Sequence, residues 1–356
     1  MINTIPCSPR EALDLLHEMY RLQLPVFLWG APGCGKSSLV RQLAGQLSAE
    51  LIDIRLTTLE SVDLRGLCWI DPETRTTRWL RPEFFPTEER PYIVFLDELT
   101  AAEPRIQASS YQLVLDRCIG QHRLPAQAWV VAAGNAPEDR AISDAMGTAL
   151  ADRFLHVRIV ANAQDWIRWA AGSDVHPSVI AFIKVRPEYL DSVGGQPRNE
   201  QLVTPSPRSW ERVSRVLKAT QDRQTRMLAV NGLVGEATAV QFFHTLDEIG
   251  NLPDMETLMG MEPAAAARRI PDTLPALYGL AYSLAGYVNS LPDFQQALAI
   301  LDAVAQKRDP LPRREIQTMG MELLLEKASR LKLMDALTRS AEYQSLYRSK
   351  AREVAR

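Results

Sequence analysis

The sequence has few of the features that mark secreted, membrane-spanning or zinc-binding proteins. It contains four cysteines, none in a Cys-x-x-Cys pair, and five scattered histidines. Neither a disulfide framework nor a zinc site is therefore expected. There is no apolar run of about 18 residues, and no basic segment followed by an apolar one opens the chain. These absences predict a cytoplasmic protein without membrane insertion.

A large excess of one charge is also missing. The 356 residues include 40 Lys and Arg and 43 Asp and Glu, for a net charge of −3. Such a chain has no overall electrostatic attraction to nucleic acid. One segment, Lys307–Arg356, is basic, with 12 basic and 7 acidic residues. This tail is either a contact for an acidic partner or nucleic acid, or a solvated amphipathic bundle.

Short apolar runs alternate with helical patterns over the first 160 residues. The strand-like runs are residues 25–29, 51–56, 92–96, 128–133 and 154–160. This alternation predicts an α/β fold with a parallel sheet covered by helices on both faces. Two hairpins are expected, one over 69–79 and one around Gly120. Beyond residue 160 only helical patterns follow, and a Pro- and Gly-rich loop or hinge interrupts them at 186–206.

A glycine-rich loop is the most informative motif. It matches G-x-x-x-x-G-K-[ST], follows an apolar run and precedes a helical pattern, the setting that a phosphate-binding loop requires. Its backbone N–H groups and the helix N-terminus favour phosphate. Lys36 is expected to reach the β- and γ-phosphates, and Ser37 to be a Mg²⁺ ligand. We expect nucleotide contacts from Gly30, Ala31, Pro32, Gly33, Cys34, Gly35, Lys36, Ser37 and Ser38.

Polar residues end two other apolar runs. Asp97 and Glu98 follow residues 92–96, and Asn135 follows residues 128–133 and Gly134. Ligands bind at the carboxyl ends of parallel strands. We expect Asp97 to hold Mg²⁺, Glu98 to deprotonate the attacking water, and Asn135 to position that water. Taken alone, each feature also fits an ordinary acidic or Gly-Asn surface turn.

Two arginines complete the candidate site. Arg208 lies in the first turn of a helix that Ser206 caps and Pro207 begins, where its charge opposes the helix dipole. A phosphate outside the helix would explain that cation, although a surface arginine would look the same. Arg153 lies in Asp152-Arg153-Phe154, just before the last strand.

The order of these motifs resembles AAA+ ATPases, most closely the MoxR family, over roughly residues 8–250. The resemblance implies an AAA+ P-loop fold with parallel strand order 5-1-4-3-2, a helical lid and an all-helical C-terminal extension. It also implies that Asn135 is sensor 1, Arg153 an arginine finger for a neighbour's ATP and Arg208 sensor 2. The implied domains are residues 1–160, with a helix-2 insert at about 57–86, a lid over 161–250 and an extension over 251–356.

The resemblance further implies a function. MoxR-like proteins are ATPases that use ATP and Mg²⁺, form homo-oligomeric rings, usually hexamers, and remodel protein partners in a chaperone-like way. The partner often carries a von Willebrand factor A domain, which here would lie on another protein. A McrB-like nucleic-acid motor is an alternative, although nucleic acid is not the expected partner. A nucleotide-gated scaffold with little turnover is another, and Glu98, Asn135 and Arg153 argue against it.

Overall fold

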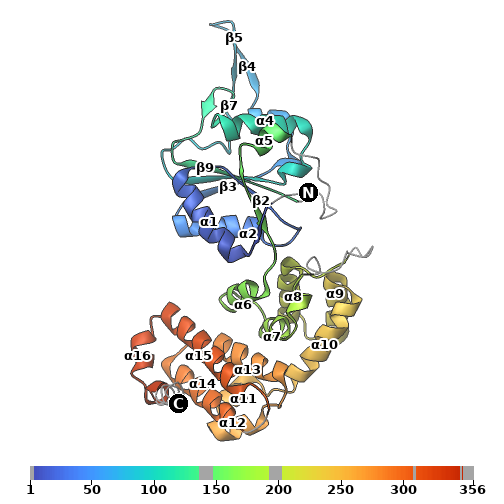
Figure 1. Cartoon of the computed structure of the whole chain (residues 1–356), viewed down its shortest axis with the longest axis vertical. Coiled ribbons are helices and arrows are strands. Elements are labelled where there is room, and N and C mark those ends of the chain that lie inside the picture. The colour runs from blue at the N-terminus through green and yellow to red at the C-terminus, as the bar shows by residue number, and fades with distance from the viewer. Residues whose placement is uncertain (1–3, 136–146, 192–202, 308–309, 345–346, 348–356) are drawn as a thin grey trace. The chain divides into compact units, whose positions relative to one another are not determined.

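The computed structural model describes residues 4–135, 147–191, 203–307, 310–344 and 347. By its internal contacts the chain divides into two units, residues 1–162 and 163–356. Figure 1 shows a sheet with helices in the first unit and helices alone in the second. The two units are described separately below.

A parallel six-stranded sheet forms the centre of the first unit. Its strands lie side by side in the order β1-β10-β2-β9-β6-β3. In chain order they are β1 (Pro6–Cys7), β2 (Val26–Trp29), β3 (Glu50–Arg55), β6 (Tyr92–Asp97), β9 (Ala128–Gly134) and β10 (Leu155–Ile159). The five predicted strands therefore have the predicted order 5-1-4-3-2. The edge strand β1 was not predicted, because its two residues are too few to show a period.

Helices cover both faces of this sheet (Figure 1). Alternate residues of the inner strand β6, which lies between β9 and β3, divide between two apolar clusters. Ile93 and Phe95 pack with α1 and α2, whereas Val94 and Leu96 pack with α4. The helices of this unit are α1 (Pro9–Leu22), α2 (Lys36–Leu47), α3 (Ser61–Arg65), α4 (Pro104–Leu115) and α5 (Thr148–Ala151). Because both faces are covered, β6 is buried along its whole length, as its continuous apolar run predicts.

Two predicted hairpins are present. The first joins β4 (Cys68–Asp71) to β5 (Thr76–Trp79), and the second joins β7 (Cys118–Ile119) to β8 (His122–Arg123). The side chains of Gln121 and His122 both contact the Trp79 carbonyl oxygen and so tie the hairpins together. The aromatic residues of the insert play different parts. Phe85 is buried in the core, while Trp69 is 46% exposed, so packing explains only some of them.

The second unit is helical throughout its described residues, as predicted. Its α-helices are α6 (Ala163–Ala171), α7 (Pro177–Val185), α8 (Pro207–Ala219), α9 (Arg223–Val234), α10 (Glu236–Gly250), α11 (Met255–Met259), α12 (Pro263–Arg269), α13 (Leu274–Tyr287), α14 (Leu291–Ala305), α15 (Arg313–Arg330) and α16 (Met334–Thr338). Helix α13 packs against both α7 and α15. The predicted lid and extension thus share contacts, and the boundary between them stays a prediction.

Two further findings concern the helices. Leu324 and Leu337 are buried within the α12–α16 bundle, whereas Leu331 is 42% exposed. Among the residues that the structure describes, no helix combines the length and the hydrophobicity needed to cross a membrane.

Candidate active site

The loop between β2 and α2 has a backbone that requires glycine. Gly33 and Gly35 have φ values of 86° and 106°, in the region that disfavours other residues. At Gly30, a Cβ atom would lie 2.8 Å from the Cys34 sulfur and 2.9 Å from the Ile159 carbonyl oxygen. The glycines of the motif are therefore explained by backbone conformation at two positions and by close packing at the third.

Lys36 is the first residue of α2, and its side chain is buried. Its Nζ donates to the carbonyl oxygens of Gly30 at 2.6 Å and Ala31 at 3.3 Å, and to Asn135 Oδ1 at 3.0 Å. The ammonium group is thus held at the carboxyl ends of β2 and β9. This confines a positive charge to the place where the loop presents its N–H groups and the α2 N-terminus begins.

Ser37 and Asp97 lie together, as predicted. The Ser37 hydroxyl donates to Asp97 Oδ2 at 2.9 Å. Among the described residues, no group of three or more His, Cys, Asp or Glu is placed to hold a metal. Mg²⁺ needs no such group, because it binds through one or two protein oxygens, phosphate and water. The hard oxygen donors of Ser37 and Asp97 fit this ion.

A second carboxylate adds to the negative charge near Asp97. Burial raises the pKa of Asp53, and the charge of Asp97 raises it further. Arg41, whose guanidinium lies 3.5 Å from Asp53, opposes this rise in pKa. Asp53 and Asp97 thus lie close enough for their charges to interact, and the cations Arg41 and Arg55 offset part of that negative charge.

Glu98 adopts a left-handed conformation, with φ 59°. Its backbone N–H donates to Asp97 Oδ1 at 2.9 Å. Its carboxylate accepts a hydrogen bond from the Thr57 hydroxyl and lies 3.7 Å from the Arg55 guanidinium. Arg55 is the last residue of β3, and Thr57 follows two residues later. Neither residue was predicted from the sequence, because neither belongs to a motif. They hold the proposed base by its reactive oxygens.

Asn135 is brought to the site by β9. Its side chain accepts from Lys36, and its backbone carbonyl oxygen lies 3.4 Å from the Thr100 hydroxyl. Space beside it is tight, since a Cβ on Gly134 would lie 2.5 Å from that hydroxyl. The structure thus brings Lys36, Ser37, Asp97, Glu98 and Asn135 together at one edge of the sheet.

Arg153 lies between α5 and β10. Its guanidinium is 3.3 Å from Asp152 Oδ2 and lies over the Tyr111 ring, 5.6 Å from the ring centroid. Its side chain is one-third exposed. Its predicted role in a neighbouring site stays a prediction.

Arg208 belongs to the second unit. It is exposed in the first turn of α8, where Ser206 and Ser209 form a reciprocal cap. Its neighbour Trp210 is fully buried and donates to the Tyr189 carbonyl oxygen at 2.8 Å. The turn that carries Arg208 is therefore firmly anchored within its unit. Its role as sensor 2 stays a prediction.

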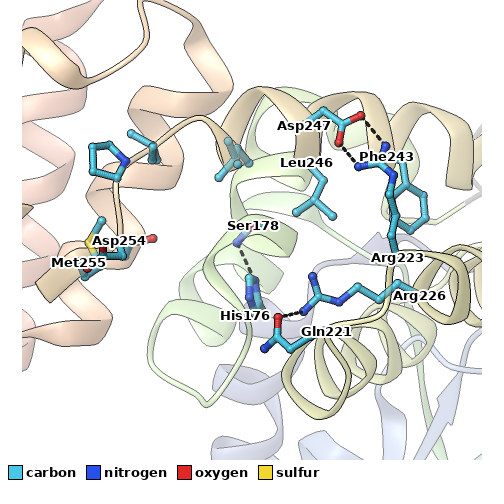
Figure 2. Close-up of a pocket in the computed structure, with 15 residues that line it drawn as sticks. His176, Ser178, Gln221, Arg223, Arg226, Phe243, Leu246, Asp247, Asp254 and Met255 are labelled. Carbon is cyan, nitrogen blue, oxygen red and sulfur yellow. Dashed lines mark hydrogen bonds and ion pairs between the residues drawn. The ribbon is translucent and has the colours of Figure 1, made fainter. Parts of the chain in front are cut away.

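The second unit also contains a cavity of about 500 Å³ between α9, α10 and the segment before α11. Figure 2 shows that its charged and polar side chains contact one another: Arg223 pairs with Asp247, Arg226 with Gln221, and His176 accepts from the Ser178 N–H. Burial, with Arg226 and Lys218 nearby, lowers the pKa of His176 to about 4. In this wall the charges of Arg223 and Asp247 balance each other, Arg226 is hydrogen-bonded to neutral groups, and His176 is an uncharged helix cap.

The sheet order, the glycine loop and the Ser37–Asp97 pair define the first unit as an AAA+ P-loop module. Residues 25–154 match the sequence profile of the AAA domain, dynein-related subfamily. This match runs from the residue before β2 to the residue before β10, and so includes every candidate site residue of the first unit. The finer assignment to the MoxR family is not part of this finding.

Solved structures with a similar fold include RuvB, the Holliday junction branch migration motor of Thermotoga maritima. It has a TM-score of 0.40 and 13% identity, over 73% of this chain and 80% of that one. NtrX from Brucella abortus, in complex with ADP, has a TM-score of 0.36 and 14% identity, over 93% and 70%. A search of curated proteins finds no match.

Proposed function

We propose that the protein is a Mg²⁺-dependent ATPase. The observation that carries this proposal is the contact between Ser37 and Asp97 beside a buried Lys36 in a glycine loop. ATP rather than GTP is inferred from the AAA domain. Mg²⁺, when bound by Ser37 and Asp97, supplies positive charge to the β- and γ-phosphate oxygens.

The side chains of the site then have separate tasks. Lys36 exchanges its contacts with loop carbonyl oxygens for phosphate oxygens. Glu98 accepts the proton of the attacking water after its carboxylate leaves Thr57 and Arg55. Asn135 orients that water through its amide. In the state that the structure describes, the Glu98 carboxylate is held by the Thr57 hydroxyl and lies beside the Arg55 guanidinium.

We further propose that Arg153 acts on ATP bound by a neighbouring subunit. It follows α5, and its guanidinium lies near Asp152 and the Tyr111 ring. A residue that serves a neighbour requires a head-to-tail interface, and such interfaces close into rings when the rotation allows. A homo-oligomeric ring, as in the hexamers of the MoxR family, is the assembly that we propose.

Mixing two inactive variants tests this role. Arg153→Ala is expected to bind ATP and lose most turnover, because an arginine finger contributes about 10³–10⁵ in rate. Lys36→Ala cannot bind ATP but retains its finger. In mixed rings, Arg153→Ala sites beside Lys36→Ala subunits should recover activity. Failure of every mixing ratio to raise the rate would contradict action in trans.

The work that we propose for this ATPase is chaperone-like remodelling of a protein, in the manner of MoxR-like proteins. A partner with a von Willebrand factor A domain is the one we expect. Four cysteines without a disulfide, among the described residues, are consistent with a reducing compartment and thus with the cytoplasm. Copurification with an ATP-locked Glu98→Gln variant, compared with Lys36→Ala, would identify the partner.

A nucleic-acid motor is the second candidate. The exposed Trp69 and the nearby Arg75 and Arg78 of the first hairpin are the feature that favours it. Binding to single- or double-stranded DNA that falls steeply with salt would support this alternative. Stimulation of ATP turnover by a protein partner, with no response to DNA or RNA, would support remodelling.

A further inference from the structure

A chain of hydrogen bonds joins the strand before the phosphate loop to the segment that carries Arg153. The indole Nε1–H of Trp29 donates to His156 Nδ1 at 2.8 Å. His156 Nε2 lies 2.8 Å from the Ala151 carbonyl oxygen. An indole nitrogen only donates, so Nδ1 of His156 is the acceptor and Nε2 carries the proton that Ala151 accepts. The tautomer is therefore fixed by the two partners.

Packing reinforces this chain. The rings of Trp29 and His156 stack with centroids 5.9 Å apart and planes at 23°. On the same face, Phe27 contacts the edge of Phe154, with centroids 5.5 Å apart. Trp29 and Phe154 are both buried. The residues on either side of Arg153 are thus attached to β2 by hydrogen bonds and by aromatic contacts.

The carbonyl group that His156 contacts lies at the C-terminal end of α5, just before Arg153. Ala151 is the last residue of α5, where helix carbonyls lack an intrahelical partner. It also accepts from the Phe154 backbone N–H at 3.2 Å, which closes the turn around Asp152 and Arg153. His156 therefore holds the turn from which the Arg153 side chain starts, and Trp29, one residue before Gly30, holds His156.

We propose that His156 is a positioning residue for Arg153, and that Trp29 fixes its orientation. This inference rests on the proposed role of Arg153 in a neighbouring site. A finger acts only when its guanidinium is placed within a fraction of an ångström, and a misplacement of about 1 Å can cost 10²-fold in rate. The hydrogen bonds of His156 go to Trp29 and Ala151, neither of which is a residue of the glycine loop. Its loss should therefore affect the neighbour's turnover and spare binding in its own site.

Three substitutions separate the contributions. His156→Phe retains a ring that stacks on Trp29 and removes both hydrogen bonds. His156→Gln retains one acceptor and one donor. His122→Phe is the matched control, since it also removes a histidine hydrogen bond to a backbone carbonyl oxygen, that of Trp79 at 2.9 Å, and its ring lies beside Phe85. We expect His156→Phe to lower kcat about 10- to 100-fold with unchanged ADP affinity by calorimetry, His156→Gln to retain more activity, and His122→Phe to match wild type.

Mixing then tests the direction of the effect. Lys36→Ala subunits, which have an intact finger segment, should restore turnover at neighbouring His156→Phe sites. The double variant Lys36→Ala/His156→Phe should not. If the defect were confined to the variant's own site, or were a general loss of stability, the single and the double variant would have the same effect on turnover at His156→Phe sites. If His156→Phe fails to fold, Trp29→Phe, which removes the indole donor and retains a smaller aromatic ring, is measured in the same way.

The outcomes distinguish this inference from the function on which it rests. Wild-type kcat in both His156→Phe and Trp29→Phe would overturn the positioning role. A reduced kcat in His156→Phe without rescue, while Arg153→Ala is rescued, would also overturn it. If Arg153→Ala is not rescued either, action in trans is itself wrong, and the role of His156 falls with it.

Discussion

The uncharged cap of α7 predicts how stability of the helical unit depends on pH. His176 Nδ1 accepts from the Ser178 N–H at 3.2 Å, an interaction that requires an unprotonated nitrogen. Burial and the cations Arg226 and Lys218 lower the pKa of His176 to about 4. In the unfolded chain a histidine has a pKa of about 6.5. The unfolded state therefore binds the proton first as the pH falls.

This difference in pKa sets the direction of the pH dependence. Above pH 7 His176 is neutral in the folded and unfolded states, so it does not change the free energy of unfolding. As the pH falls from about 6.5 to 4, stability is lost by about 2 kcal/mol at pH 5 and by at most about 3 kcal/mol at pH 4. That loss is a large share of the roughly 5–15 kcal/mol that stabilises a domain.

Urea unfolding at pH 7.5 and pH 5, followed by tryptophan fluorescence, measures this loss in the whole chain. The matched variant is His176→Asn, which retains a side-chain acceptor for the Ser178 N–H but does not titrate. We expect the variant to lose about 2 kcal/mol less than wild type between the two pH values. Equal losses in the two proteins, or a measured His176 pKa near its ordinary value, would refute this reasoning.

Three further predictions concern the nucleotide site. Gly35→Ala should weaken ATP binding at least about tenfold, because φ is 106° at this position. The control is Gly45→Ala, in the middle of α2, where a Cβ meets open space and ATP binding should not change. Calorimetry measures the ATP affinity of both variants. Thr57→Val should raise basal kcat up to about fivefold by releasing Glu98 from a hydrogen bond that contributes about 1 kcal/mol; a fall in kcat would show that Thr57 helps the base instead. Arg208→Ala, in a Glu98→Gln background, should narrow the gap between ATP and ADP affinities, and an unchanged ratio would contradict its role as a sensor.

The fold could be predicted largely from the sequence, because its strands are short apolar runs between turn signals. Residues 92–97 and 128–134 are buried on both sides and read as continuous apolar segments. The edge strand β1 could not be predicted, since the two residues that pair with β10, Pro6 and Cys7, are too few to show a period. The division of the insert aromatics into the buried Phe85 and the exposed Trp69 depends on tertiary packing, which no period in the sequence encodes.

The candidate site divides in the same way. Lys36, Ser37, Asp97 and Asn135 come together because parallel strands end at one edge of a sheet, and motifs mark those ends. The contacts of Glu98 with Thr57 and Arg55 could not be predicted, because they depend on a left-handed residue at 98. The hydrogen bonds of His156 with Trp29 and Ala151 could not be predicted either, because no helical or strand period relates these residues to His156.

Glu98→Gln tests the central claim, Mg²⁺-dependent ATP hydrolysis at the Lys36–Asp97 site, most directly. The substitution retains size and polarity but removes the group that accepts the proton. With ATP and Mg²⁺, wild type should release phosphate and lose that activity on chelation of the metal. Glu98→Gln should bind ATP as tightly as wild type and release almost no phosphate, whereas Lys36→Ala should not bind ATP. Undiminished phosphate release by Glu98→Gln, or ATP binding unaffected by Lys36→Ala, would contradict the account.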